Sequence, residues 1–287
     1  MLTTRSKIAL ARLCQQPLLG LRRMFGAGSA AEVSRNGLRW RLDLDEGIDF
    51  SIFLLGAFEA ATVAACERLV RAGDVVLDIG ANIGAHTLPL ARLVGPTGRV
   101  VAFEPTDFAI AKLRANLALN PAYAARVTVA QTMLLDRGDG PLPSTLPSSW
   151  PLAGGADVHP KLRGRDMTTA GAGAMTLDTY LAENAIGRVD FIKLDVDGFE
   201  CRVLAGAEET LCRCRPAIVM ELSPYILGER GDSLDRLLDI LETAGYELVD
   251  LSSEAPLPRG RDILRRMIPD GAGRNIIARP RPEPPRG

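Results

Sequence analysis

The chain has 287 residues, of which 47% are hydrophobic and 24% are charged. This length suits one large domain with additions, and the composition is that of an ordinary globular protein rather than a disordered or fibrous one. With 34 basic and 35 acidic residues the formal net charge is −1, which gives no long-range attraction to nucleic acid. No apolar stretch approaches the roughly 20 residues of a membrane-spanning helix, and the five irregularly spaced cysteines indicate reduced thiols rather than disulfides or zinc. We therefore expect a cytoplasmic protein.

The first 57 residues predict an extension ahead of the main domain. Residues 1–28 are basic and amphipathic, with no acidic residue before Glu32, and they predict a helix that packs loosely on the domain. Weak contact with an anionic membrane surface is the alternative for this segment. Asn36-Gly37 is a strong signal for a two-residue turn, so residues 32–55 predict one β-hairpin or two.

Residues 58–280 show the alternation of an α/β domain. After helical spacing over 56–74, apolar strands are predicted at 75–80, 99–105, 126–134, 189–196 and 216–223, with helices at 84–95, 107–120, 199–213 and 233–246. Continuous apolar strands separated by helices favour a doubly wound, mostly parallel, Rossmann-like sheet. Two late strands, 246–252 and 274–280, have no clear helix between them. They predict an antiparallel C-terminal edge that completes seven strands.

One segment interrupts this alternation. Residues 137–175 are rich in glycine, proline, serine and alanine, and a connection of this length inside a domain is usually a lid, a binding loop or disorder. Residues 281–287 predict a flexible tail.

The sequence VVLDIGANIGAHT, residues 75–87, predicts a strand, a glycine-containing turn and a helix, which is a common nucleotide-binding arrangement. A dinucleotide site needs a glycine where the pyrophosphate approaches, but Asn82 stands there between Gly80 and Gly84. The turn suits a ligand that ends in an amino acid instead of a phosphate. Backbone N–H groups near Asn82 could hold its carboxylate, and Asp78 could face its ammonium, directly or through water.

Glu104 ends the second strand of the domain. An acid at this point of a doubly wound sheet accepts hydrogen bonds from both hydroxyls of a ribose. NAD and S-adenosylmethionine both contain such a ribose, so Glu104 predicts a nucleoside without naming the ligand.

Several stretches, in order along the chain, carry a resemblance: VVLDIGANIGAHT, GRVVAFEP, NLALN, TLDTYL, VDFIKLDVDGFECRVLAGA and PAIVMEL. They resemble the FkbM-type methyltransferases, a family of class I S-adenosylmethionine enzymes. The resemblance implies methyl transfer to a hydroxyl oxygen on a small molecule, a sugar or a natural-product intermediate. With the turn described above, it gives the expected cofactor-binding residues Asp78, Gly80, Asn82, Gly84, Glu104, Pro105, Leu134 and Asp195.

The catalytic residues are expected beyond the carboxyl ends of the later strands, where open α/β sheets bind their ligands. Asp195 is our first candidate for the base that takes the hydroxyl proton, and Glu221 is the second. Carboxylates near two strand ends could instead hold Mg²⁺. Glu200 could simply support the first turn of the following helix.

Three residues are expected on the acceptor side of the site. Asp197 follows the fourth strand, although Asp197-Gly198 could only form the turn. His86 lies near the cofactor loop, where packing of the helix is an equal alternative. His159 lies in the long segment and could reach the acceptor as a base.

Two other functions remain open at this stage. An NAD-dependent oxidoreductase could use the same architecture, although Asn82 and the lack of a Tyr-x-x-x-Lys pair argue against it. A non-catalytic protein could keep the cofactor pocket as the partner of another enzyme. The sequence names neither the acceptor nor the oligomeric state.

Overall fold

The computed structural model describes residues 4–138, 140–153, 158–159 and 164–282. Its centre is a seven-stranded sheet in the order β12 (Tyr246–Asp250), β13 (Arg274–Pro280), β11 (Ala217–Leu222), β10 (Phe191–Leu194), β3 (Val75–Ile79), β4 (Arg99–Phe103) and β5 (Val127–Ala130). All pairs are parallel except those of β13, which is antiparallel to both of its neighbours. The mostly parallel, doubly wound sheet is therefore as predicted.

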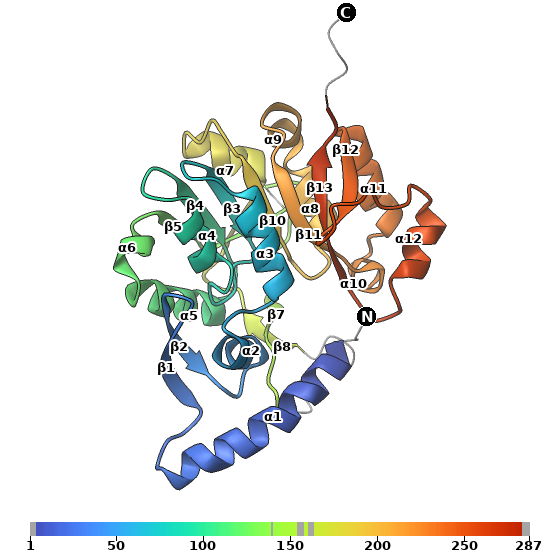
Figure 1. Ribbon diagram of the computed structural model, residues 1–287. Helices are drawn as coiled ribbons and strands as arrows, with labels where there is room; N and C mark the ends of the chain where they lie inside the picture. Colours follow the sequence, from blue (N-terminus) through green and yellow to red (C-terminus); the bar gives the residue numbers. More distant parts are fainter. Residues whose placement is uncertain (1–3, 139, 154–157, 160–163, 283–287) are drawn as a thin grey trace, which may run out of the picture.

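Helices cover both faces of this sheet (Figure 1). One face carries α3 (Ala60–Leu69), α4 (Thr87–Leu93) and α5 (Asp107–Ala118), and the other carries α7 (Leu177–Glu183), α8 (Glu200–Ala205), α9 (Glu208–Arg213), α11 (Leu234–Thr243) and α12 (Arg261–Met267). Two short helices, α6 (Pro121–Ala124) and α10 (Pro224–Glu229), lie in connections. Successive strand residues point to opposite faces, so strands covered on both sides are apolar throughout.

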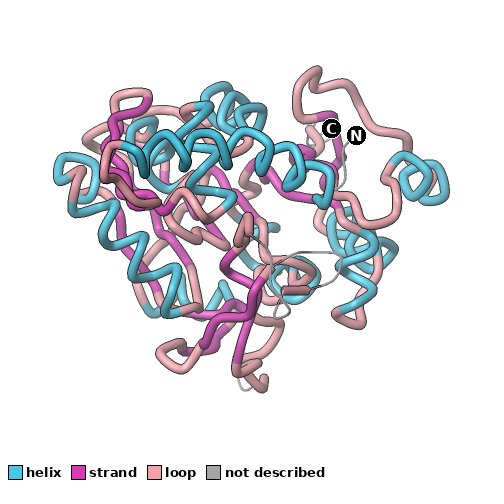
Figure 2. Tube along the Cα trace, turned by 90° about the horizontal axis from the view of Figure 1, so that it is seen from below, coloured by secondary structure: helices cyan, strands magenta, loops and turns pink. Residues whose placement is uncertain are grey.

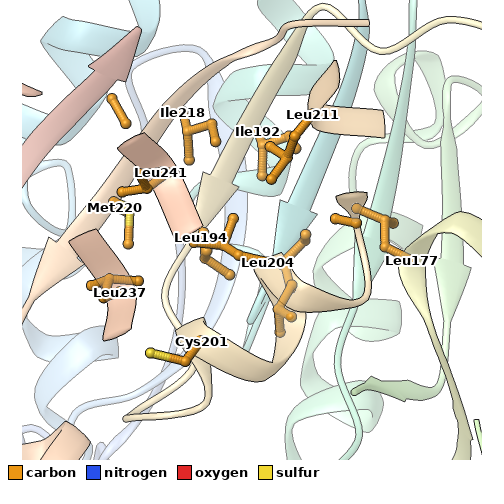
Figure 3. Packing of buried hydrophobic residues seen from close by; sticks show 14 of the residues in the cluster. Leu177, Ile192, Leu194, Cys201, Leu204, Leu211, Ile218, Met220, Leu237 and Leu241 are labelled. Carbon is orange, nitrogen blue, oxygen red and sulfur yellow. The ribbon is translucent and has the colours of Figure 1, made fainter. Parts of the chain in front are cut away.

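Figure 3 shows the larger of the two resulting layers, where side chains of β10 and β11 meet those of α8, α9 and α11. Leu194 and Ile218 are fully buried there against leucines that include Leu204 and Leu237. Burial of a leucine contributes roughly 1.5–3 kcal/mol to stability. This layer therefore holds the strands and helices in place, and with them the loops at the strand ends.

The N-terminal extension comprises α1 (Thr4–Met24), the hairpin of β1 (Ala30–Arg35) and β2 (Leu38–Asp43), and α2 (Gly47–Leu55). The predicted turn is confirmed, with φ of 50° at Asn36 and 75° at Gly37. A second hairpin was wrong, because residues 47–55 form a helix. Their short apolar run fits a helix or a strand equally well, and the left-handed Gly56 ends it as a helix.

Two asparagines of the domain hold the free edge of β2. Asn116 in α5 accepts a hydrogen bond from the backbone N–H of Arg41 at 2.8 Å and donates to the carbonyl oxygen of Ile83 at 3.0 Å. Asn120 accepts from the N–H of Arg39 at 2.9 Å. These side chains replace a neighbouring strand, and they join the extension to the loop that follows β3.

Three predicted elements are divided or rearranged. The strand predicted at 126–134 is broken at Gln131, after which β6 (Thr132–Leu134) pairs with β9 (Gly173–Met175) outside the main sheet. The helix predicted at 199–213 is two helices, the first of which ends at the C-cap Gly206, where a Cβ would lie 2.1 Å from the carbonyl oxygen of Leu135. At the C-terminus the predicted antiparallel edge is present, because β12 and β13 pair antiparallel at one end of the sheet, but α12 separates them along the chain and β13 lies between β11 and β12.

The described parts of the 137–175 segment include the antiparallel pair β7 (Thr145–Ser149) and β8 (Arg165–Thr168). This pair lies beside α2 below the sheet in Figure 1. The Glu46 carboxylate accepts hydrogen bonds at 2.8 Å from the hydroxyl of Ser149 and from the backbone N–H of Trp150. The segment and the N-terminal extension therefore form one structure.

Across the described residues, no single helix has the length and apolarity to cross a membrane; α2 and α3 together satisfy both measures but meet at an angle of 73°.

The anchoring of β2 generates a stability prediction. Asn116→Ala leaves the partly buried N–H of Arg41 and the buried carbonyl of Ile83 without these partners, so it should lower the free energy of unfolding by about 2–4 kcal/mol. Urea unfolding measures this change. The matched variant Asn184→Ala removes an exposed asparagine whose amide donates only to the carbonyl oxygen of Tyr180 in its own helix, and it should change stability by less than about 1 kcal/mol. Equal effects of the two variants would contradict the anchoring role.

Candidate active site

The loop after β3 runs so close to β10 that its first residue must be glycine. Gly80 has a φ of 85°, and a Cβ there would lie 1.8 Å from the carbonyl oxygen of Asp195. The backbone N–H groups of Gly80 and Ala81 both donate to the carbonyl oxygen of Phe103. A side chain at position 80 would collide with the protein backbone before it met any ligand. The glycine therefore positions the loop as well as leaving room beside it.

Asn82 joins this loop to two other segments. Its φ is 46°, and its backbone N–H donates to Glu104 Oε2 at 3.0 Å. Its Nδ2 donates to the carbonyl oxygen of Ser148 in β7 at 3.0 Å, and its Oδ1 accepts from the N–H of Ile83. The Asn82 side chain holds the inserted segment against the loop, a role that the sequence did not predict.

A cavity of about 690 Å³ opens beside the loop, at the carboxyl ends of the central strands. Small-molecule sites usually occupy about 300–1,000 Å³. The sequence-predicted residues that line it are Gly80, Asn82, His86, Glu104, Pro105, Leu134, Asp195, Asp197 and Glu221. Three predicted residues, Asp78, Gly84 and His159, do not line it.

Asp78 and Gly84 support the loop from within the protein. Asp78 is fully buried and accepts a hydrogen bond from the Thr87 hydroxyl at 2.6 Å. Burial raises the pKa of Asp78, while the Lys193 ammonium opposes this. At Gly84 a Cβ would lie 2.7 Å from Leu113 Cδ1 on α5. Asp78 thus lies below the cavity, where it has no direct access to a ligand's ammonium.

Glu104 lines the cavity, and its carboxylate accepts hydrogen bonds from the loops that contain Asn82 and Thr106. Oε1 accepts from the Thr106 hydroxyl at 2.6 Å and from its backbone N–H at 2.9 Å, while Oε2 accepts from Asn82. Burial raises the pKa of Glu104, and the hydrogen bonds from Thr106 and Asn82 oppose the increase. A carboxylate has about four acceptor positions, so ribose hydroxyls can still be accepted.

A buried lysine lies among the acids of the cavity. Lys193 is 4% exposed, and its Nζ lies 3.1 Å from Asp195 Oδ2. Burial alone would lower its pKa, but the carboxylates of Asp195, Asp78 and Glu59 outweigh burial and raise it. Lys193 is therefore a fixed positive charge on the floor of the site.

The other acids near β10 and β11 have raised pKa values. Burial, then the charges of Asp195 and Glu200, raise the pKa of Asp197 to about 8. Burial followed by the charges of Asp195 and Glu59 also raises the pKa of Glu221 well above its ordinary value. No hydrogen bond to the Glu221 carboxylate is present among the residues that the structure describes. Glu221 is therefore a cavity-lining carboxyl group with a raised pKa.

Glu200 supports the turn after β10 rather than facing the cavity. It begins α8, and its Oε1 accepts hydrogen bonds from the backbone N–H groups of Val196 at 3.2 Å and Gly198 at 3.4 Å. Burial raises the pKa of Glu200 to about 7. Asp197 itself stands in a left-handed conformation within this turn, so it serves the turn and the cavity together.

The two histidines occupy different surroundings. His86 lines the cavity, packs against Phe58 with ring centroids 6.0 Å apart, and is neutral because burial lowers its pKa to about 3. The 3.9 Å approach of its Nε2 to Glu59 is therefore not an ion pair. His159 lies 3.4 Å from Glu229 and outside the cavity lining. Residues 154–157 and 160–163 around it lie outside the described part of the chain.

The described acids do not assemble into a metal site. Within the described ranges, no group of three or more histidine, cysteine, aspartate or glutamate side chains is placed to hold a metal ion. The donor set around Asp195 thus does not fit the Mg²⁺ alternative, since the Lys193 ammonium lies 3.1 Å from its Oδ2.

Comparison with known proteins decides the family. The sequence model of the methyltransferase FkbM domain matches residues 78–248, which include the glycine loop, Glu104, both acidic strand ends and the intervening helices. The chain belongs to the FkbM methyltransferase family. The resemblance found in the sequence motifs is confirmed, and an S-adenosylmethionine-dependent methyltransferase is supported.

The chain is similar to three relatives, and it covers a different share of the length of each. It is 32% identical to the 31-O-demethyl-FK506 methyltransferase FkbM of Streptomyces tacrolimicus, over 68% of this chain and 80% of that protein. It is 29% identical to the 2-O-methyltransferase NoeI of Sinorhizobium fredii, over 67% and 78% respectively. It is 28% identical to the antimetabolite synthetase AmbE of Pseudomonas aeruginosa over 61% of this chain, but spans only 10% of that relative.

Sequence reasoning missed several residues of this FkbM-family site. Lys193 was read as part of a strand, although a lysine within the apolar run VDFIKLDV was itself a signal of a buried partner. Glu59, Ser148 and Trp150 also line the cavity. Glu59 lies directly before α3, and the other two residues lie in the 137–175 insertion. No local sequence pattern places these segments against the glycine loop.

The buried acid Glu200 generates a pH prediction. Its folded pKa, about 7, lies above the ordinary 4.5, so the folded state binds more protons between these values and stability falls as pH rises through them. Glu200→Gln should weaken this fall between pH 5 and 7.5 by on the order of 1–3 kcal/mol. Urea unfolding at both pH values measures it. The exposed control Glu208→Gln should keep the wild-type pH dependence, and a Glu200→Gln curve that also keeps it would refute the assignment.

Proposed function

We propose that this chain transfers the methyl group of S-adenosylmethionine to a hydroxyl oxygen on a small molecule, a sugar or a natural-product intermediate. The observation that carries the proposal is the charge of the cavity beside the glycine loop. Its lining includes the carboxyl groups of Glu59, Glu104, Asp195, Asp197 and Glu221, against the single ammonium of Lys193. The O-methyltransferase names of the FkbM and NoeI relatives support the same reaction class.

The excess of acid favours a cationic ligand. S-adenosylmethionine supplies an electrophilic methyl group on a positively charged sulfur. Burial and mutual repulsion raise the pKa of the Asp197 and Glu221 carboxyl groups, and a positive charge beside them would favour their ionised forms. The NAD alternative is disfavoured for the same reason, because the carboxylates would repel its anionic pyrophosphate and Asn82 occupies the usual place of close approach.

Glu221 is the better placed of the two candidate bases. Asp195 lies 3.1 Å from the Lys193 ammonium, so taking a proton would cost this residue its ion pair. Glu221 has no such partner among the described residues, and burial raises its pKa, so its ionised carboxylate is a stronger base than an exposed one. In the proposed reaction the acceptor oxygen bonds to the methyl carbon as the sulfur–carbon bond breaks. The hydroxyl proton passes to Glu221, and the neutral thioether leaves.

The Asp195–Lys193 pair then has a positioning role. Its lysine is buried on the floor, and its aspartate begins the turn that carries Asp197. A fixed charge pair keeps the acceptor and the methyl donor aligned, and alignment alone can supply a large part of the rate of such a transfer.

The cofactor assignment makes a binding prediction. Glu104→Ala removes the acceptor for the ribose and the hydrogen bonds that hold Thr106 and Asn82, so it should weaken S-adenosylmethionine binding by about 10²-fold or more. Isothermal calorimetry measures the affinity, with circular dichroism to verify the fold. Glu183→Ala, an exposed glutamate on α7, should bind as wild type. Wild-type protein that binds NAD but not S-adenosylmethionine would reject the cofactor assignment.

The base assignment makes a kinetic prediction. Once a panel of sugars and macrocyclic alcohols has yielded an acceptor with radiolabelled S-adenosylmethionine, Glu221→Gln should lower kcat by about 10²–10⁴. The affinity for S-adenosylmethionine should stay within about threefold. Asp195→Asn is the comparison, and a larger kcat loss there would transfer the base role to Asp195. Full activity in both variants would leave alignment as the source of catalysis.

A further inference from the structure

The outward side of α1 is apolar along most of its length. Leu10, Leu13, Pro17, Leu21 and Met24 recur every three or four residues, which places them on one side of the helix. All five are exposed, Leu13 to 74% and Met24 to 81%, and Phe25 just beyond the helix is equally open. Apart from α1 and α2, the described part of the chain exposes one other large apolar side chain, Ile263. We call this row of five residues the α1 stripe.

The α1 stripe is continuous with the mouth of the cavity. The neighbouring helix α2 exposes Leu54 and Leu55, and these two leucines line the cavity together with Leu10 and Cys14 of α1. Figure 2, seen from below, shows the long α1 helix crossing the near side of the molecule. One apolar surface therefore runs along α1 and around the opening of the site.

The opposite side of α1 is bound to the protein, so the stripe has a defined orientation. Leu19 is buried against the hairpin, and Gln15 Nε2 donates to the carbonyl oxygen of Leu44 at 2.8 Å. The Arg12 guanidinium donates to the carbonyl oxygen of Leu152 in the inserted segment. The exposed stripe is the side of the helix that makes none of these contacts.

The charge of this region indicates what covers it. Residues 1–28 contain five basic residues and no acidic residue. Arg23 is exposed beside the stripe. A second copy of the chain packed on this face would bring two such basic segments together. A surface of anionic lipid satisfies both the apolar stripe and the positive charge.

We propose that α1 and α2 dock on the surface of an anionic lipid bilayer, with the α1 stripe, Phe25, Leu54 and Leu55 in the headgroup boundary. The helix lies in the plane of the surface rather than across it, as an amphipathic helix with a basic flank does. The opening of the cavity then faces the lipid. This inference does not depend on the proposed methyl acceptor.

Vesicle co-sedimentation of the full chain tests the proposal. The probes are vesicles of phosphatidylcholine alone and vesicles of phosphatidylcholine with phosphatidylglycerol in equal parts. We expect binding to the anionic vesicles, at least about tenfold weaker binding to the neutral ones, and loss of binding at high salt. The double variant Leu13→Gln/Leu21→Gln should bind anionic vesicles at least about tenfold less, because neither side chain can then enter the apolar boundary.

Matched measurements separate docking from misfolding and from self-association. Ile263→Gln changes an exposed isoleucine on α12 and should bind vesicles as wild type does. Leu13 and Leu21 do not line the cavity, so the double variant should keep the wild-type affinity for S-adenosylmethionine in calorimetry. Failure to bind anionic vesicles, or equal binding by the double variant, would overturn the proposal. So would a concentration-dependent dimer in sedimentation equilibrium that the double variant abolishes.

Discussion

A single buried ammonium compensates the acids on which the site is built. Lys193 stands between Asp78 beneath the loop and Asp195 at the end of β10, and it also feels the charge of Glu59 from the start of α3. Without this charge, adjacent parallel strands would end in mutually repelling, poorly hydrated carboxylates. With it, one acid supports the loop from below, and another remains available at the cavity surface.

The Lys193 ammonium compensates only part of the acidic charge of the site, because several carboxyl groups surround this one positive charge. Asp197, Glu200 and Glu221 all have raised pKa values, with burial as the leading cause. The three acids differ in position. Glu200 accepts backbone hydrogen bonds in the turn after β10, while Asp197 and Glu221 line the cavity. The same group of acids therefore stabilises the turn after β10 and gives the cavity an acidic lining that favours positive charge.

Features that depend on local sequence pattern were predicted correctly. Features that depend on contacts between distant segments of the chain were not. Apolar strands, the Asn36-Gly37 turn and the glycine loop follow from spacing and backbone preference, and all three are present. Residues 47–55 were mistaken for strand because their helical form depends on packing against the hairpin. Direct contact of Asp78 with a ligand was one of two alternatives, and spacing could not decide between them because it does not say on which side of the loop a side chain points. Lys193 was missed because two of its acidic neighbours, Asp78 and Glu59, come from distant parts of the chain.

The wall of the cavity has a consequence for how the protein folds. Glu46 binds Ser149 and Trp150, more than a hundred positions away, and Asn82 binds Ser148, so one wall needs the beginning and the middle of the chain together. Closing such long loops is slow compared with forming local helices and turns. The sheet can assemble first, and the wall that shapes the cavity then closes over it. This wall of the cavity is thus completed late in folding, and substitutions in it can reshape the cavity while leaving the central sheet intact.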